Sequence, residues 1–327
     1  MKNLSLEKTL RILCITSDDK IVAIAPLRQQ NHAVKGLFHY RVIEPLDYET
    51  ATDYTGLIIA EKEIQCLQLF FTYLYNQNDW DCISFNDIPQ TSMIIDLLQK
   101  NKNLFPNLKI TQGAICPYMP LPNSMDSFTK GLSRNLRKNL RKSLRNLEKD
   151  FGKVELKEYS ELDSLENTMQ LFFDLHQKRW ISKGGPGAFS SQKIRNIFMD
   201  RAILFAEKGW LGLYFLTVND TPVAARYTLK YDQKVYGCLS GLDPAYSSYR
   251  VGNIALLKLI EKCIAQGIKE YDFMKGDESY KSDWTKTYRR NSNLELINQS
   301  FTSRITMLGM KTARKSKIAS LLAKFSN

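Results

Sequence analysis

The chain has 327 residues, of which 43% are hydrophobic, and it carries a formal net charge of +12. Its 16 tyrosines and 16 phenylalanines supply apolar volume for one large domain or two of ordinary size, which excludes a wholly disordered chain. The six cysteines form no CxxC pair and there are three histidines, so we expect reduced thiols and no metal site. No window approaches the roughly 20 apolar residues of a membrane span, and no secretory signal opens the sequence, so we expect a cytoplasmic protein.

The positive charge is concentrated in two segments. Residues 130–150 hold eight basic and two acidic side chains, and residues 301–327 hold six basic and no acidic ones. The first segment predicts an amphipathic helix whose basic face is either a solvated surface or a track for a polyanion. The second predicts a basic amphipathic tail, which is either a frayed terminus or an interfacial helix held reversibly at an anionic membrane.

The first half of the chain predicts an α+β domain. Alternating apolar residues indicate a hairpin that turns at Asp18 and Asp19. The expected elements, in chain order, are strands over 11–17, 20–28, 38–43 and 55–60, a helix over 61–76, a strand over 80–85 and a helix over 92–101. Three prolines within residues 117–122 cannot continue a helix or a central strand, so we place a domain boundary after residue 122.

The second half begins with a long basic helix that links the halves. The expected elements are this helix over 127–149, a strand over 153–159, helices over 161–183 and 192–208 with a glycine-rich loop over 182–187 between them, a three-stranded meander over 210–242, a glycine-led helix within 243–267 and a strand ending in DFMKG within 268–284. We therefore expect domains over 1–122 and 123–300 and a separate tail over 301–327.

Motifs of the second half resemble those of the GNAT superfamily of acyl-CoA N-acyltransferases. They are RNLRKNLRKSLRNLEKD, LHQKRW, GGPGAF, PVAARYTLKYD, LSGLDPAYSSYRVGNIAL and YDFMKGDESYKSDW, which together cover about residues 130–285. The likeness is greatest to the CelD-like branch, associated with bacterial cellulose and exopolysaccharide synthesis and related to the Fem aminoacyltransferases. The first half matches more loosely, through IVAIAPL and DYTGLIIA, as an abbreviated GNAT-like half. The resemblance implies a tandem GNAT-like α+β fold, with two mixed-sheet halves joined by the long basic helix.

The same resemblance implies an N-acyltransferase. The enzyme would move an acyl (acetyl) group from acyl-CoA to an amine of a sugar or polysaccharide precursor, without a metal. One alternative is a Fem-type transferase whose donor is carried by tRNA, which a basic surface would bind with steep salt dependence. A second alternative is a non-catalytic GNAT-fold scaffold of an exopolysaccharide system.

The glycine-led helix is the expected site for coenzyme A phosphates. Helix N-termini present unpaired N–H groups and partial positive charge, which bind anions. GNAT enzymes carry an Arg/Gln-x-x-Gly-x-Gly/Ala pattern here, whereas this chain has Tyr249 and Ile254 at the first and last positions. We expect coenzyme A contacts from Arg250, Val251, Gly252 and Asn253, and from the backbone of Leu239 and Ser240 in the preceding strand; the alternative is a glycine that merely opens a helix.

Acyl transfer to an amine needs a base and a proton donor for the leaving thiolate. The expected catalytic residues are Asp272 at the end of a strand, Glu278 in the following loop and Tyr280. Each has a structural alternative: Asp272 accepting backbone hydrogen bonds, Glu278 as a solvated loop acid, and Tyr280 packed with a satisfied hydroxyl.

Two tryptophan-containing segments are expected to hold the acceptor. On a helix, His176 and Trp180 share a face and Arg179 lies beside them, which suits stacking on a sugar and binding of an anion. Lys281 and Trp284 form a similar pair. The alternative is that both tryptophans belong to the core and that Arg179 pairs with a carboxylate.

Overall fold

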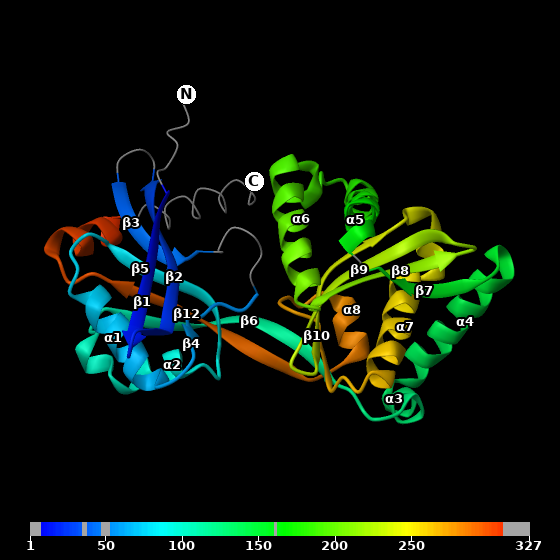
Figure 1. The fold of residues 1–327 in the computed structure, drawn as a ribbon, viewed down its shortest axis with the longest axis horizontal. Helices are drawn as coiled ribbons and strands as arrows, with labels where there is room; N and C mark the ends of the chain where they lie inside the picture. Colours follow the sequence, from blue (N-terminus) through cyan, green and yellow to red (C-terminus); the bar gives the residue numbers. More distant parts are fainter. Residues whose placement is uncertain (1–7, 35–37, 47–52, 160–161, 310–327) are drawn as a thin grey trace, which may run out of the picture. The chain divides into compact units, whose positions relative to one another are not determined.

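The computed structural model describes residues 8–34, 38–46, 53–159 and 162–309, and the chain divides into two compact units (Figure 1). Unit 1 comprises Met1–Ile115 and Arg289–Asn327, and unit 2 comprises Cys116–Tyr288. The division falls within strand β6. Residues 289–300, which we expected in the second domain, lie in unit 1 because strand β12 pairs with β5 there.

Unit 1 is a mixed sheet packed against two helices. Its elements are β1 Lys8–Ser17, β2 Lys20–Val34, β3 Phe38–Pro45, β4 Ile58–Ile59, α1 Glu63–Tyr75, β5 Cys82–Pro89, α2 Met93–Lys100, the first part of β6 Leu108–Pro120, and β12 Tyr288–Ile297. The strand order is β1-β2-β3-β5-β12-β6, and β4 pairs with β2. β3 and β5 run parallel, whereas β1, β2 and β3 form an antiparallel meander. The expected hairpin, both helices and the β5 strand are confirmed.

The core of unit 1 follows from helical spacing. Leu67, Phe70, Phe71 and Leu74 lie on one face of α1 and are buried against the sheet. The N-terminus of α2 is capped by Ser92, whose hydroxyl accepts a hydrogen bond from the backbone of Ile94.

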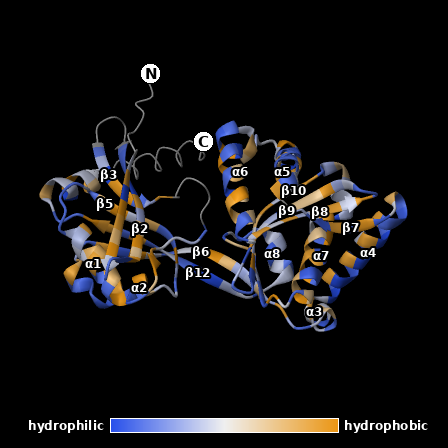
Figure 2. Cartoon of the chain, in the orientation of Figure 1, coloured by the Kyte–Doolittle hydropathy of each residue, from blue (hydrophilic) through white to orange (hydrophobic). Residues whose placement is uncertain are grey.

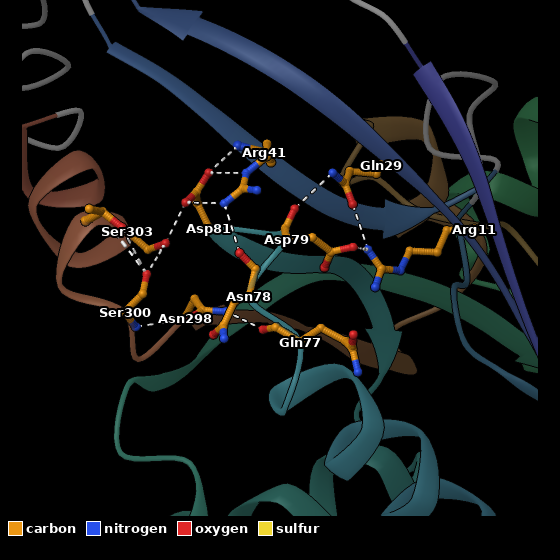
Figure 3. Close-up of polar contacts among 11 residues, drawn as sticks. Arg11, Gln29, Arg41, Gln77, Asn78, Asp79, Asp81, Asn298, Ser300 and Ser303 are labelled. Carbon is orange, nitrogen blue, oxygen red and sulfur yellow. Dashed lines mark hydrogen bonds and ion pairs between the residues drawn. The ribbon is translucent and has the colours of Figure 1, made fainter.

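A buried carboxylate ties the returning chain to unit 1 (Figure 3). Asp81 accepts hydrogen bonds from the backbone N–H and the guanidinium of Arg41, and from the hydroxyl of Ser303. Nearby, the side-chain amide of Asn298 donates to the carbonyl of Gln77 at 2.9 Å. Burial raises the pKa of Asp81, but the hydrogen bonds from Arg41 and Ser303 outweigh it, so the pKa lies below its usual value.

Unit 2 is a mixed sheet with helices on both faces. Its elements are the end of β6, α3 Met125–Gly131, α4 Arg134–Phe151, β7 Val154–Glu158, α5 Leu165–Ile181, α6 Gln192–Glu207, β8 Leu211–Val218, β9 Thr221–Tyr231, β10 Lys234–Leu242, α7 Val251–Ala265, β11 Glu270–Asp272 and α8 Ser279–Trp284. The strand order is β6-β11-β10-β9-β8-β7. Buried residues of α5 and α6 pack on one face of the sheet, and those of α4 and α7 pack on the other (Figure 1).

The predicted basic helix is present, but it begins later than expected. Residues 125–131 form α3, and Ser133 then caps α4 by accepting a hydrogen bond from the backbone of Leu136. Leu136, Leu140 and Leu147 are buried on one face of α4, so hydrophobic and hydrophilic residues alternate along it in Figure 2.

The proline-rich segment does not end a strand, contrary to our expectation. β6 continues through Pro117 to Pro120 and pairs with β11. Pro117 lies just beyond the last paired residues of β6 and β11, Tyr118 and Asp272, and its carbonyl accepts a hydrogen bond from the backbone of Phe273. A proline excludes a strand position only where its missing N–H would face a partner.

The tail is described only in part. Residues 301–309 are helical, with Phe301, Ile305 and Leu308 exposed and Met307 buried, and residues 310–327 lie outside the described residues. Within the described part of the chain, no helix has the length and apolarity that a membrane crossing requires.

Candidate acyl-transfer site

The sheet of unit 2 opens between β10 and β11. These parallel strands pair only at Lys234–Tyr236 with Glu270–Asp272. β11 then ends, while β10 continues to Leu242 against β9, with a register shift between Gly237 and Leu239. One edge of β10 is therefore without β11 beyond Tyr236, and the bulge turns the strand and increases its twist there.

Two glycines of β10 permit close approaches around this open edge. A Cβ at Gly237 would lie 2.3 Å from the hydroxyl oxygen of Tyr271. A Cβ at Gly241 would lie 2.6 Å from the backbone nitrogen of His176 and 2.7 Å from the carbonyl carbon of Leu175. Gly241 therefore lets the backbone of α5 lie directly on β10, and this sets the position of the side chains that follow on α5.

The loop after β10 leads into α7. Asp243 accepts a hydrogen bond from the backbone of Ala245, and Arg250 adopts a left-handed conformation at the N-cap of α7. Gly252 has no positive φ, and the nearest atom to an added Cβ would be 3.7 Å away in Leu242. Packing therefore does not require glycine at this position, whereas close approach of a ligand to the backbone would.

The residues that we expected to contact coenzyme A lie between the bulge of β10 and the first turn of α7, and some of their atoms already form hydrogen bonds within the chain. Leu239 and Ser240 follow the bulge of β10. Arg250 is exposed and Gly252 is partly exposed, whereas the Val251 side chain is buried. The backbone N–H of Asn253 donates to the carbonyl of Arg250 at 2.8 Å, so this amide serves the first turn of the helix.

The two expected carboxylates differ in access. Asp272 is completely buried, and its Oδ1 accepts a hydrogen bond from the backbone of Met274 at 2.7 Å. The Glu278 side chain is 58% exposed, and its Oε2 lies 2.8 Å from the ammonium of Lys281. Burial raises the pKa of Glu278, but the hydrogen bond and charge of Lys281 and the charge of Arg179 outweigh it, so the pKa lies below its usual value.

Lys281 and Trp284 support this site from within the fold. The ammonium of Lys281 donates to the carbonyls of Met274 and Lys275 at 3.2 and 2.8 Å, so this buried side chain holds the loop before α8. Trp284 belongs to the core between α7 and the sheet. Neither geometry presents the side chain to an acceptor. Tyr280 is partly buried and packs edge-on against Phe273.

His176 and Trp180 form one hydrogen-bonded unit on α5. The indole N–H of Trp180 donates to His176 Nε2 at 3.0 Å, which leaves the proton of a neutral imidazole on Nδ1. Burial lowers the pKa of His176 to about 4, and the charge of Arg179 contributes. His176 is thus neutral at pH 7, while the ring of Trp180 remains 41% exposed.

Arg179 reaches the open edge of β10. Its Nη1 donates to the hydroxyl of Ser240 at 2.6 Å and to the Ser240 carbonyl at 3.2 Å. Ser240 is paired in register with Arg226 of β9, whose Nη2 donates to the carbonyl of Gly252 at 2.8 Å. The edge of β10 and the first turn of α7 are therefore connected through arginines.

Several buried polar atoms around β10 have no hydrogen-bond partner in the described part of the chain. They are His176 Nδ1, Arg226 Nε, and the hydroxyls of Tyr227 and Tyr271. Buried polar groups in folded proteins are nearly always hydrogen-bonded, so each of these atoms is a position where a ligand could complete the contacts. Among the described residues, no group of histidine, cysteine and acidic side chains has the arrangement of a metal site.

Sequence analysis did not single out Arg226 or Tyr271. Both lie in strands whose alternation indicates only a sheet, and a strand pattern does not reveal which buried polar atom lacks a partner. An arginine in the otherwise apolar run PVAARYTL was the one available signal.

The comparisons with known proteins concern the domain family and the fold. Residues 134–282 match the family described as acetyltransferase (GNAT) domain. None of the curated proteins compared with the sequence matches it.

Solved structures of similar fold include FemX, with 12% identity, a TM-score of 0.60, and coverage of 91% of this chain and 90% of that chain. The C-terminal domain of a putative lysylphosphatidylglycerol synthetase from Agrobacterium fabrum has 8% identity, a TM-score of 0.54, and coverage of 91% and 87%. The L-PGS structure from Bacillus licheniformis has 11% identity, a TM-score of 0.54, and coverage of 92% and 88%. These likenesses extend over both units, and the expected α+β GNAT-like fold class is confirmed.

Proposed function

We propose that the protein is an N-acyltransferase that moves an acyl group from acyl-CoA to an amine. The observation that carries the proposal is the opening of β10 from β11 beside the N-terminus of α7. An open strand edge offers backbone groups to the thioester arm of the donor, and a helix N-terminus offers N–H groups and partial positive charge to its diphosphate. The match of residues 134–282 to the GNAT acetyltransferase domain supports this reading.

The residues present fit such a donor. Gly252 leaves the first turn of α7 open to close approach, and Arg250 is exposed at its N-cap. Bound acyl-CoA supplies an activated thioester carbonyl. Backbone N–H groups near Leu239 and Ser240 would polarise that carbonyl, as oxyanion-type donors do in acyl transfer.

Proton transfer in this proposal falls to the loop after β11. Glu278 would take the amine proton, directly or through water, because it is more than half exposed while Asp272 is fully buried. Tyr280 would return a proton to the leaving sulfur. Lys281 holds the loop in place, and Trp180 offers an exposed ring against which an acceptor sugar would stack.

The enzyme assay follows release of free thiol from acetyl-CoA in the presence of amines. Glu278→Gln is expected to reduce kcat about 10²-fold or more, the usual contribution of general base catalysis. Asp277→Asn, which removes the neighbouring exposed acid, is the matched control and is expected to leave kcat unchanged. Equal rates in wild type and Glu278→Gln would remove Glu278 from the mechanism.

The proposed acceptor is a sugar or polysaccharide precursor, as the resemblance to the CelD-like branch implies. Its proposed place is the cytoplasmic face of the membrane, with the tail over 301–327 in peripheral contact with anionic lipid. Exposed Phe301, Ile305 and Leu308 share one helical face, which supports the contact. Flotation with anionic liposomes should recover the full chain and lose it when residues 301–327 are removed, and equal recovery of both would refute the contact.

A second candidate is a donor carried by tRNA. Arg134, Arg137, Lys138, Arg141, Lys142 and Arg145 of α4 line a shallow concavity of about 480 Å³. A duplex phosphate backbone would fit this basic face, and binding would weaken steeply with salt. Co-purified tRNA, together with the absence of a thermal shift from acetyl-CoA, would favour this donor. A non-catalytic scaffold role would instead be favoured if Glu278→Gln kept the cellular phenotype while charge reversal on α4 abolished it.

A further inference from the structure

Two arginines meet at the open edge of β10. Arg179 comes from α5 and is fixed on Ser240 by the hydrogen bonds described above. Arg226 comes from β9, opposite Ser240, and is only 7% exposed. Burial lowers the pKa of Arg179 and the charge of Arg226 lowers it further, as expected for two guanidinium groups close together in a dehydrated place.

Neither guanidinium forms an ion pair with a carboxylate of the described residues. The charge of Glu278 and the hydroxyl of Tyr280 also act on Arg179, but the Glu278 carboxylate is paired with Lys281. Nε of Arg226 is buried and has no hydrogen-bond partner within that same part of the chain. The site therefore holds two positive charges and a buried donor without a partner, and the Glu278 carboxylate, whose charge reaches Arg179, is already paired with Lys281.

Unit 1 contains a buried arginine, Arg28, that is paired with a carboxylate of the same unit. Arg28 has a side chain that is 7% exposed, and its Nη2 lies 2.8 Å from Oε1 of Glu44, which is equally buried. A buried charge is retained in folded proteins when it is paired or when a ligand pairs with it. Arg28 is paired with a carboxylate of the chain, whereas Arg226 has no such partner among the described residues and is left with a ligand as its partner.

A second group points to a ligand at the same place. Tyr271 is 1% exposed, its hydroxyl has no partner among the described residues, and it lies against Gly237 at the start of the open edge. The charge of Arg226 acts on the Tyr271 hydroxyl, so the two groups are neighbours. Together they offer N–H and O–H donors, which match the oxygens of an anion.

We propose that Arg179 and Arg226 form a subsite for an anionic group of the substrate, a carboxylate or a phosphate, separate from the diphosphate site at α7. The proposal rests on the proposed acyl-transfer function and names its substrate class. The anion is carried either by the acceptor amine or by the far end of the acyl chain. Arg179 and Arg226 bind and position it, and the hydroxyl of Tyr271 donates the third hydrogen bond.

The first test measures anion binding directly. Inorganic phosphate is titrated at constant ionic strength and followed by calorimetry and thermal shift. Arg226→Gln and Arg179→Gln are each expected to weaken phosphate binding more than about tenfold, because each removes a charge-assisted hydrogen bond. Lys208→Gln removes one exposed charge at the end of α6 and should leave binding unchanged. Far-UV circular dichroism establishes that each variant is folded, and Arg179→Gln, at a partly buried position near the end of α5, serves if Arg226→Gln does not fold.

Saturating coenzyme A distinguishes the subsite from the diphosphate site. Phosphate that still binds in its presence supports a separate subsite, whereas competitive displacement overturns the proposal. This binding experiment does not require enzymatic turnover. If the protein bound phosphate through Arg226 but had no affinity for coenzyme A, the anion subsite would be supported and the acyl-CoA donor would be refuted.

Two matched ligand pairs identify the source of the anion. Succinyl-CoA against butyryl-CoA tests an acyl chain with a terminal carboxylate, and a phosphorylated amino sugar against its neutral parent tests the acceptor. Tighter binding of the anionic member of one pair, abolished by Arg226→Gln, supports the proposal and assigns the source. Equal affinities within both pairs overturn it.

Discussion

Gly241→Ala tests whether the direct contact of α5 with β10 builds the site. The added Cβ would lie 2.6 Å from the backbone nitrogen of His176 and 2.7 Å from the carbonyl carbon of Leu175. Backbone atoms of a packed helix cannot rotate away as a flexible side chain does, so α5 must shift from the sheet. Overpacking of this kind costs about 3 kcal/mol, at the upper end of the usual range.

For a unit of this size, each 1 kcal/mol corresponds to roughly 2–4 °C in Tm, so Gly241→Ala should lower Tm by about 6–12 °C. Differential scanning calorimetry measures the change. Gly252→Ala is the matched control, because its nearest neighbour would be 3.7 Å away and its Tm should stay within about 2 °C of wild type. Equal stability of the two variants would refute the claim that Gly241 sets the distance between α5 and β10.

Two pH dependences follow from buried groups. The pKa of His176 is lowered from 6.5 to about 4, so the unfolded chain binds this proton more tightly than the folded chain does. The stability attributable to His176 is therefore complete above pH 6.5 and falls by on the order of 2 kcal/mol toward pH 4. The free energy of unfolding of His176→Gln, measured with urea, should depend less on pH over this window. The pKa of Asp81 is lowered from 3.8, so the stability that Asp81 contributes is present above this pH and is lost as pH falls below it. Asp81→Asn should lower the free energy of unfolding by about 2 kcal/mol at pH 7 and by progressively less below pH 3.8. A loss of stability independent of pH would exclude the Arg41 and Ser303 contacts as its origin.

Much of unit 2 could be predicted from the sequence because its elements are strongly patterned. β8 is a mostly apolar run that is buried along its whole length, α7 has helical spacing, and turns of polar residues separate the strands of the meander. The leucine face of α4 likewise predicted a buried stripe, although the break at Ser133 was missed because the leucine spacing continues across it, from Leu132 to Leu136. The local sequence pattern therefore predicted that the segment is helical, whereas the capping residue determined where the helix begins.

The site was less accessible to sequence reasoning, for physical reasons. The roles of Lys281 and Arg226 depend on which carbonyls lie within hydrogen-bond reach after folding: those of the loop before α8 for Lys281, and that of Gly252 in α7 for Arg226. The pairing of β12 with β5 joins residues about 200 positions apart, and no local pattern encodes it. The sequence offers Asp272 and Glu278 as equivalent candidates for a base, and only the folded structure shows that Asp272 is fully buried while Glu278 is exposed.

Calorimetric titration of coenzyme A and acetyl-CoA into wild type and Gly252→Ala tests the central claim most directly. The account predicts saturable binding to wild type and at least about tenfold weaker binding to Gly252→Ala, because the added methyl would separate a diphosphate from the backbone of α7 while leaving the fold intact. Gly131→Ala, at an open position of α3, is the control and should bind as wild type does. Absence of binding to wild type, or equal affinity in both glycine variants, would contradict the assignment of α7 and the open edge of β10 as the donor site.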